Sequence, residues 1–218
     1  MSRRSRPPVR IGRAEWKLRD DRLFLVATED TYAPKQYFDG LSLSRVKVVV
    51  LETPEGSGLC APCHVVERLS ERLQKAKQAG EVQDDDQSWV LMDTDHHVNE
   101  NHKKSFIEAL DSARKSGFQI AISNPSFEIW LLLHHADLDG AVSYRSSVSV
   151  QKELVRVLGN YDKSRLDAAC FPIAKIPEAI RRARALEDSP DNPKGYWPTK
   201  PGTRVYLLLE ALGFGKQK

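Results

Sequence analysis

Short apolar runs alternate with helical patterns along the first part of the chain. The runs are each about one strand long and rich in β-branched residues, as buried parallel strands tend to be. They cover residues 22–27, 46–51, 88–92 and 118–122. Between them, apolar residues recur at helical spacing over residues 64–79 and 101–116. This alternation predicts a mainly parallel α/β sheet with right-handed crossovers and helices on both faces.

The remainder of the chain shows helical patterns without strand-like runs between them. Helix-like patches at residues 150–158, 176–186 and 204–212 predict a helical C-terminal extension. Arginines concentrate in the residues before the first strand. The sequence therefore predicts three parts, which are a basic flexible tail over residues 1–20, an α/β domain over residues 21–140 and a helical extension over residues 141–218.

Carboxylates follow two strands of the predicted sheet. Glu29 and Asp30 come after the first strand, and Asp93 and Asp95 come after the third. Open α/β sheets bind ligands at the carboxyl ends of their strands, so these side chains would form one acidic cluster if the two strands are neighbours. Carboxylates packed side by side repel, and a hard cation such as Mg²⁺ is the usual compensation. The alternative is that these residues only cap helices and turns.

A second notable segment reads I-S-N-P-S-F-E-I-W-L-L-L-H-H over residues 122–135. It predicts a helix that is apolar on nearly all sides and hence buried, with Ser123 or Asn124 as N-cap and Pro125 in the first turn. Glu128 lies inside this apolar run, where an unpaired carboxylate is costly. Two roles are open for it: a structural charge at the helix start or in a salt bridge to an arginine, or a part of the site.

Composition narrows the class of protein. With 218 residues, 40% of them hydrophobic, the chain can bury a substantial core. Charged residues nearly balance to a net charge of +3, so the whole chain is not a polycation. No apolar run approaches the roughly 18 residues of a membrane span, and the basic N-terminus is not followed by the apolar run of a signal peptide. We therefore expect a cytoplasmic protein without a membrane partner.

The cysteines agree with that compartment. Cys60, Cys63 and Cys170 are too few, and odd in number, for a disulfide framework. The residues C-A-P-C-H over 60–64 spell a haem-attachment pattern, but haem attachment needs export, which nothing in the sequence signals. The plain interpretation is a loop that enters a helix at Pro62.

The acidic residues also resemble a known family pattern. A glutamate after the first strand and D-x-D after the third are the signature of the Toprim fold, the metal-binding domain of topoisomerases, primases and OLD-type nucleases. More specifically, the chain resembles the RloB family. The segments that carry this resemblance are E-D-T-Y-A-P-K-Q-Y-F (29–38), L-M-D-T-D-H-H (91–97), the stretch 122–135 and, more weakly, P-G-T-R-V-Y-L-L-L-E (201–210).

Two positions depart from the family pattern. Asp30 stands where the pattern has glycine, and Pro34 stands where it has a second acidic residue. Glycine allows a close approach of phosphate to the backbone, so Asp30 either narrows that approach or adds a ligand. Loss of the second acidic residue leaves open whether one or two metal ions bind.

The resemblance implies a Toprim-like α/β fold and divalent-metal chemistry on phosphodiesters. We expect a nuclease that uses Mg²⁺ or Mn²⁺ and acts on RNA, with transfer RNA among the candidates, or on DNA, as an effector of antiviral defence. The expected catalytic residues are Glu29, Asp93, Asp95 and Glu128, of which the first three would also hold the metal. The expected contacts to phosphate are Asp30, His96, Lys103, Lys104 and Asn124.

The expected partners are nucleic acid and another defence-system protein such as an ATPase, and an oligomer is compatible with the sequence. A rival hypothesis belongs to a different class. The weakened acidic element after the first strand also fits a non-catalytic regulatory subunit that binds nucleic acid or nucleotide and keeps the fold without turnover. Joint metal binding by Glu29, Asp93 and Asp95 would favour the enzyme.

Overall fold

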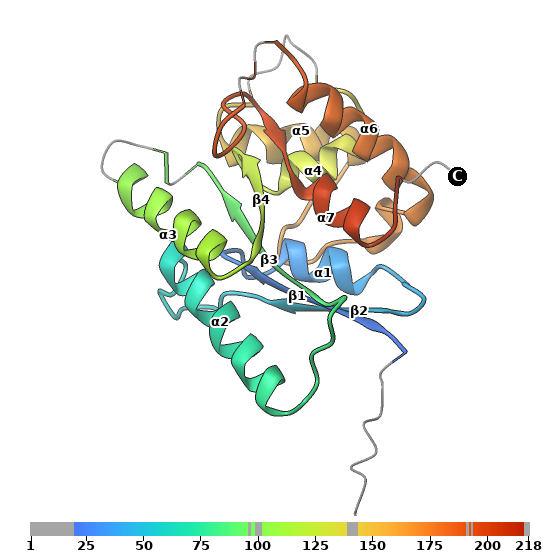
Figure 1. The fold of residues 1–218 in the computed structure, drawn as a ribbon. Helices are drawn as coiled ribbons and strands as arrows, with labels where there is room; N and C mark the ends of the chain where they lie inside the picture. Colours follow the sequence, from blue (N-terminus) through green and yellow to red (C-terminus); the bar gives the residue numbers. More distant parts are fainter. Residues whose placement is uncertain are drawn as a thin grey trace, which may run out of the picture.

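A five-stranded sheet organises the computed structural model, which describes residues 20–95, 97–98, 102–138, 144–190, 192 and 194–215 (Figure 1). The strand order is β2-β1-β3-β4-β5, in which β1 to β4 are parallel and β5 pairs antiparallel with β4. The strands are β1 (Arg22–Thr28), β2 (Val46–Leu51), β3 (Gln87–Asp93), β4 (Gln119–Asn124) and β5 (Gly202–Thr203). The predicted α/β class with a mainly parallel sheet is confirmed.

Seven α-helices are found in the described part of the chain. They are α1 (Ala33–Asp39), α2 (Pro62–Gln78), α3 (Lys103–Lys115), α4 (Glu128–Leu133), α5 (Ser147–Leu158), α6 (Ile176–Glu187) and α7 (Val205–Ala211). The four predicted strands and most predicted helices lie close to their expected positions, and α2 begins at Pro62 as expected. Two elements, α1 and β5, were not predicted. β5 has only two residues, too few to show a pattern, whereas α1 buries Ala33, Pro34, Tyr37 and Phe38 at a helical spacing that sequence reasoning missed.

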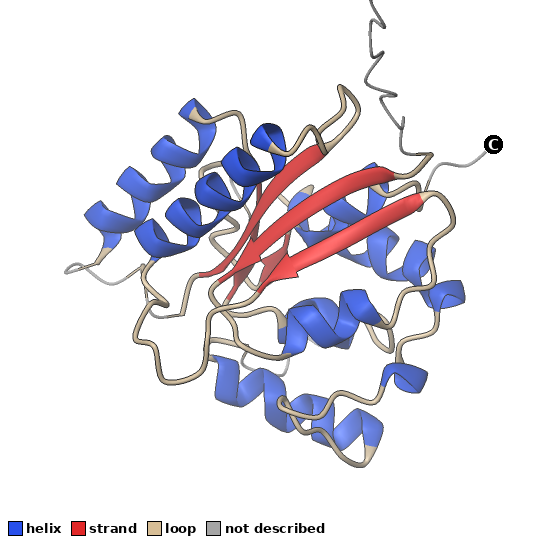
Figure 2. Ribbon diagram, turned by 90° about the horizontal axis from the view of Figure 1, so that it is seen from below, coloured by secondary structure: helices blue, strands red, loops and turns tan. Residues whose placement is uncertain are grey.

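Helices cover both faces of the sheet (Figure 2). Successive side chains of a strand point to opposite faces, and β1 divides its apolar residues accordingly. Leu23 and Leu25 pack in one core layer with α2 and α3, whereas Phe24 and Val26 pack in the other with α1 and α4. Apolar side chains on both faces explain why the strands read as continuous apolar runs.

The C-terminal elements join the same sheet and core. The strand β5 pairs with the end of β4, and helices α5, α6 and α7 contribute to the core layer that contains α4. Figure 1 shows these helices together on one side of the sheet, opposite α2 and α3. The predicted basic tail lies almost entirely outside the described residues.

The segment 122–135 forms the predicted buried helix, but its predicted start is wrong. Helix α4 begins at Glu128, and Ser123 and Asn124 are the last residues of β4 instead of N-caps. Their side chains have other partners: the Ser123 hydroxyl lies 2.8 Å from that of Thr203, and the Asn124 amide donates to the Pro198 carbonyl at 2.7 Å. These contacts attach the C-terminal strand and the loop before it to β4.

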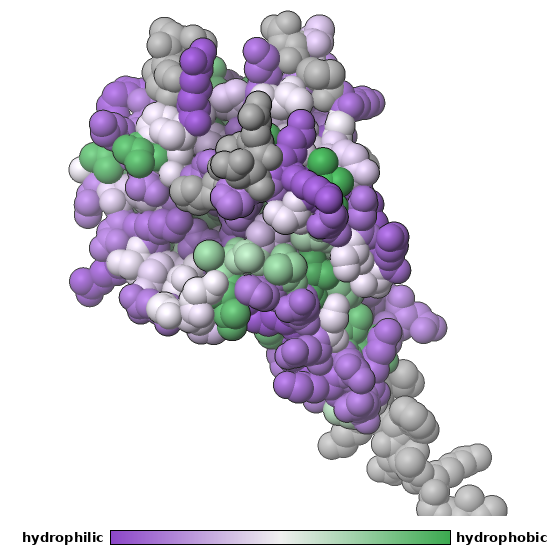
Figure 3. Space-filling model, turned by 90° about the vertical axis from the view of Figure 1, so that its left-hand side faces the viewer, coloured by the Kyte–Doolittle hydropathy of each residue, from purple (hydrophilic) through white to green (hydrophobic). Residues whose placement is uncertain are grey.

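The surface on the side that carries α3 is mainly hydrophilic, with a smaller hydrophobic area in its lower half (Figure 3). This distribution agrees with the burial of most apolar side chains in the two core layers. None of the helices within the described ranges has the length and apolarity needed to cross a membrane.

Candidate functional site

The strand order creates a crevice at the carboxyl ends of β1 and β3. The chain passes from β1 to β2 on one side and then returns to place β3 on the other side of β1. Ligands in open α/β sheets bind where the strand order reverses in this way. Glu29 directly follows β1, and Asp93 ends β3. β1 and β3 are neighbours, which was the condition for a single acidic cluster, and their acidic residues meet at one edge of the sheet.

Glu29 is held toward β3 by two contacts. Its Oε1 accepts a hydrogen bond from the Asp93 backbone N–H at 3.0 Å, and its Oε2 lies 2.9 Å from Nε2 of His97. The His97 ring stacks on Phe106 of α3, with 5.3 Å between ring centroids. Sequence reasoning named His96, which lies outside the described residues, and missed its neighbour His97.

Asp93 and Asp95 open onto a cavity of about 230 Å³, which we call the acidic pocket. The loop that carries them is attached to the loop after β4, because the Thr94 and Asp95 N–H groups both donate to the Pro125 carbonyl, at 3.0 and 3.1 Å. The side chains that line the pocket come from segments far apart in the chain: Glu29, Asp30, Cys60, Asp93, Asp95, His97, Ser126, Ser147 and Lys163.

Lys163 is the main cation of the acidic pocket, and sequence reasoning missed it. Its Nζ lies 2.6 Å from Oδ2 of Asp30 and 3.7 Å from Oε1 of Glu128. Burial opposes the charge of Lys163, but the negative charges of Glu128 and Asp30 prevail and raise its pKa. A lysine in a polar loop after α5 gives no sequence signal, because only the fold brings that loop to the end of β1.

Glu128 is fully buried beneath the pocket, at 0% exposure. Its Oε1 accepts hydrogen bonds from the Tyr161 hydroxyl and the Gln151 amide, both at 3.2 Å. Its Oε2 has no hydrogen-bond partner in the described part of the chain. The cation beside it is Lys163 instead of the arginine that the structural hypothesis named. Glu128 is thus close to the acidic cluster and only partly satisfied by its neighbours.

Burial and neighbouring negative charges make the ionised form of the carboxylates in this cluster unfavourable. Burial, followed by the charges of Glu29, Glu128 and Asp30, raises the pKa of Asp93 well above its usual value, and Lys163 only partly opposes this. Burial also raises the pKa of Glu29, although the hydrogen bond from His97 lowers it. The cluster therefore has more negative charge than Lys163 compensates, and a further cation would stabilise it.

A pH-dependent difference in stability is expected between the wild type and Asp93→Asn. The raised pKa means that the folded protein binds the Asp93 proton more tightly than the unfolded chain, so this group costs stability as the pH rises through its folded pKa. At slightly alkaline pH and without metal, Asp93→Asn should melt about 2–4 °C higher than the wild type. This is the shift expected when the free energy of unfolding rises by about 1 kcal/mol. The difference should shrink as the pH falls toward the ordinary pKa of aspartate. Melting curves of both proteins across pH test this, and a constant difference would contradict it.

The remaining predicted phosphate contacts lie in different places. Lys103 and Asn124 line a second groove, which shares Asp95 with the acidic pocket. Lys104 is exposed on α3, where its Nζ lies 4.0 Å from a carboxylate oxygen of Glu108. Asp30 lies in the acidic pocket, but it contacts Lys163. Of the predicted phosphate contacts, Lys103 is thus the exposed cation beside the site.

Glu29, Asp93 and Asp95 offer the hard oxygen ligands that Mg²⁺ and Mn²⁺ prefer. Their mutual repulsion and the unpartnered Oε2 of Glu128 fit a divalent cation chemically. Within the described ranges, however, no three acidic, histidine or cysteine side chains already converge as they would around an ion. Both oxygens of Glu29 are engaged by Asp93 and His97, so Glu29 would have to turn to become a ligand.

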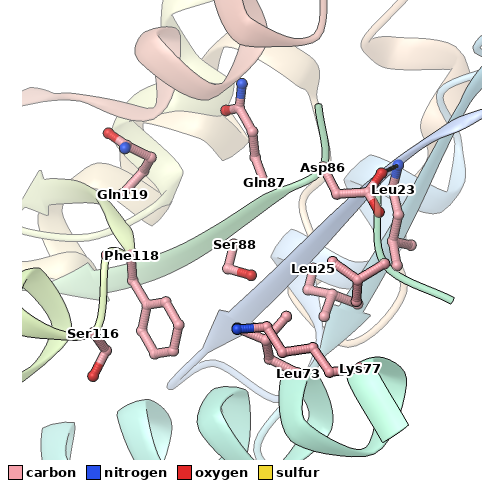
Figure 4. Close-up of a pocket in the computed structure, with 12 residues that line it drawn as sticks. Leu23, Leu25, Leu73, Lys77, Asp86, Gln87, Ser88, Ser116, Phe118 and Gln119 are labelled. Carbon is pink, nitrogen blue, oxygen red and sulfur yellow. Dashed lines mark hydrogen bonds between the residues drawn. The ribbon is translucent and has the colours of Figure 1, made fainter. Parts of the chain in front are cut away.

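A cavity at the opposite edge of the sheet lacks comparable chemistry. It measures about 290 Å³ and lies among Leu23, Leu25, Phe118 and the end of α2 (Figure 4). Its carboxylate, Asp86, accepts hydrogen bonds from the Leu23 and Gln83 N–H groups, at 2.6 and 2.8 Å. That carboxylate therefore serves to hold the loop before β3, and the acidic pocket remains the candidate site.

Comparison with known proteins gives one match. No curated protein and no solved structure matches the chain. The model of one protein family, described as RloB-like protein, matches residues 24–212, a range that runs from β1 to the end of α7. Because this match covers far more than half of the chain, the protein belongs to the RloB-like family.

Proposed function

We propose that this protein is a divalent-metal-dependent nuclease with a Toprim-like catalytic domain. The observation that carries the proposal is the gathering of Glu29, Asp30, Asp93 and Asp95 around one pocket at the point where the strand order reverses. Four carboxylates on a catalytic edge, with one lysine among them, match what phosphodiester hydrolysis with Mg²⁺ or Mn²⁺ requires. RNA, including transfer RNA, and DNA are the candidate substrates.

Each residue of the pocket has a role in this proposal. Asp93, Asp95 and Glu29 would hold the metal, which when bound supplies polarisation of the scissile phosphate and a water of lowered pKa. The contact between Glu29 and His97 gives a pair of groups able to accept and return a proton beside the reacting phosphate. Lys163 would place a positive charge beside a bound phosphate. Glu128 would act from below by orienting Lys163 or the water.

The biological role proposed is that of an antiviral defence effector in the cytoplasm. Membership of the RloB-like family supports this role. The three cysteines are free thiols, which agrees with a reducing compartment. A second defence-system protein such as an ATPase, or a further copy of this chain, is the partner class that such an effector would use.

The test is a cleavage assay with purified full-length protein. Single-stranded and duplex DNA, short RNA and total RNA are incubated with Mg²⁺, with Mn²⁺ and with EDTA, and the products are separated on denaturing gels. Cleavage is expected with Mg²⁺ or Mn²⁺ and not with EDTA. Absence of cleavage with both metals on all of these substrates would contradict an enzyme that is active alone.

One observation favours a second candidate function. Glu29 is already engaged by His97 and Asp93, and Asp30 is already paired with Lys163, so the pocket partly satisfies its own charges. A protein that keeps the fold and binds nucleic acid or nucleotide without turnover would have this property. Calorimetric titration with Mn²⁺ separates the two candidates, because the enzyme requires metal binding that depends jointly on Glu29, Asp93 and Asp95.

A further inference from the structure

A second cavity, which we call the Tyr196 groove, lies beside the acidic pocket. It measures about 650 Å³, and Asp95 lines both cavities. Its other walls include Lys103 at the start of α3, Arg145 before α5, and the loop residues Tyr196 and Trp197. The groove therefore begins where the acidic pocket ends, and a long ligand in one would extend into the other.

Tyr196 combines exposure with a fixed position. It is 40% exposed, which is unusual among the aromatic side chains that the structure describes. Its hydroxyl donates to Asp111 at 3.2 Å, and the Arg114 guanidinium lies 4.3 Å from its ring centroid. Tyr196 lines the groove, whereas Arg114 does not. Because the contacts with Asp111 and Arg114 already fix the ring, binding a ligand would cost little side-chain entropy. An exposed ring of this kind is suited to stacking against a flat ligand.

The loop that carries Tyr196 is also anchored along its backbone. The Arg204 guanidinium donates to the Gly195 and Tyr196 carbonyls, at 3.0 and 2.8 Å, and is itself held by Glu187 at 2.8 Å. At the other end of the loop, Asn124 donates to the Pro198 carbonyl, and the Trp197 ring packs against Phe106 with 5.3 Å between centroids. The position of Tyr196 relative to β4 is therefore set by the core.

The groove also presents cations that the rest of the described chain leaves uncompensated. Lys103 and Arg145 are both exposed, and neither forms an ion pair with any described residue. Other exposed cations in the described part of the chain, such as Lys77 and Lys115, also lack an ion pair with a described residue, so Lys103 and Arg145 are distinguished by their place beside Tyr196. Two unpaired cations flanking a fixed aromatic ring are the combination by which proteins hold unpaired bases and their phosphates.

We infer that the Tyr196 groove binds single-stranded nucleic acid. One unpaired base stacks on Tyr196, and Arg145 and Lys103 contact the phosphates beside it. The strand then continues past Asp95 into the acidic pocket, where the next phosphodiester meets the carboxylates. This inference rests on the proposed function for what happens in the pocket, but not for binding in the groove. A base inside a duplex is stacked on both faces and is not available to Tyr196.

Binding without cleavage provides the test. Full-length protein in EDTA is titrated against fluorescein-labelled single-stranded DNA, single-stranded RNA and duplex DNA of equal length, and fluorescence anisotropy is measured. Tyr196→Leu should weaken single-strand binding about tenfold, and Tyr196→Phe should bind nearly as the wild type does, since it keeps the stacking ring. Arg145→Ala should weaken binding and lower the slope of log affinity against log salt by about one.

The matched control is Lys77→Ala, which removes one positive charge at the opposite edge of the sheet (Figure 4). Its binding should equal that of the wild type. Melting curves establish that each variant is folded. The inference is overturned if folded Tyr196→Leu and Arg145→Ala bind as the wild type does, if Tyr196→Phe loses as much as Tyr196→Leu, or if duplex binds as tightly as single strand.

The two proposals fail separately in these experiments. Loss of single-strand binding in the Tyr196→Leu variant, in a protein that cleaves nothing with Mg²⁺ or Mn²⁺, would support the groove and contradict the nuclease. Metal-dependent cleavage by the wild type with unchanged binding by Tyr196→Leu would support the nuclease and contradict the groove. Comparison of the DNA and RNA probes shows which sugar the groove prefers.

Discussion

Replacing both Asp93 and Asp95 by asparagine is expected to reduce metal-dependent cleavage by at least about 100-fold. The two residues are two of the three expected metal ligands, with Glu29 as the third, and asparagine lacks the negative charge that holds a divalent ion. The fold should survive, because removal of like charges from a buried cluster relieves repulsion. Cleavage rates measured on gels with Mg²⁺ and Mn²⁺ test the first statement.

Thermal melting gives a second readout that does not depend on turnover. Metal that binds only the folded state raises the melting temperature of the wild type, by roughly 5–10 °C at about 100 times its dissociation constant. The double variant should lose this response. Asp39→Asn is the matched control, since Asp39 is an exposed carboxylate on α1 that is paired with Lys35. A double variant that cleaves at the wild-type rate would end the metal hypothesis.

Replacing Lys163 by methionine is expected to destabilise the protein strongly. Methionine has a similar length but leaves the buried carboxylates of Asp30 and Glu128 without their cation. Breaking a fully buried ion pair typically costs 3–5 kcal/mol. The Lys163 side chain keeps 38% exposure, so we expect about 1–3 kcal/mol, or a melting temperature lower by roughly 3–10 °C.

Lys35→Met is a closely matched control for this change. The Lys35 side chain is 39% exposed and lies 3.2 Å from Asp39, so its own exposure and pairing resemble those of Lys163. Its partner is 53% exposed, however, whereas the side chain of Asp30 is 4% exposed. Loss of an ion pair between exposed groups should cost less than about 1 kcal/mol. Equal losses in the two variants would show that burial of the partner carboxylates has no effect.

A second substitution should partly rescue Lys163→Met. Glu128→Gln in the same chain removes one buried negative charge that methionine leaves uncompensated, and the amide keeps the shape of the side chain. The double variant should therefore melt above Lys163→Met alone. If the changes in stability caused by the two single substitutions simply add in the double variant, Lys163 and Glu128 are not coupled. The contact of 3.7 Å between them would then contribute nothing measurable to stability.

The pattern of apolar runs and helical spacing was sufficient to predict the four parallel strands and helices α2, α3, α5, α6 and α7. It succeeded because continuous apolar runs and one-sided helical stripes are direct consequences of burial between two layers. Glu29, Asp93 and Asp95 could be named from the sequence, because residues at the ends of strands are carried to the carboxyl edge of the sheet by the strands themselves. The two-residue β5 is too short to show a period, whereas the helical spacing of the buried residues in α1 was missed.

The tertiary structure alone decided which distant residues meet those carboxylates. Gln151 reaches the cluster from α5, and Tyr161 and Lys163 reach it from the loop after α5. No local pattern marks them, because single polar residues on helices and in loops are ordinary. The start of α4 was also decided by distant contacts, since Ser123 and Asn124 bind the C-terminal strand and loop instead of capping the helix. Local sequence therefore determined that the carboxylates lie at the carboxyl ends of β1 and β3. The packing of segments far apart in the chain determined which charges and aromatic rings surround them.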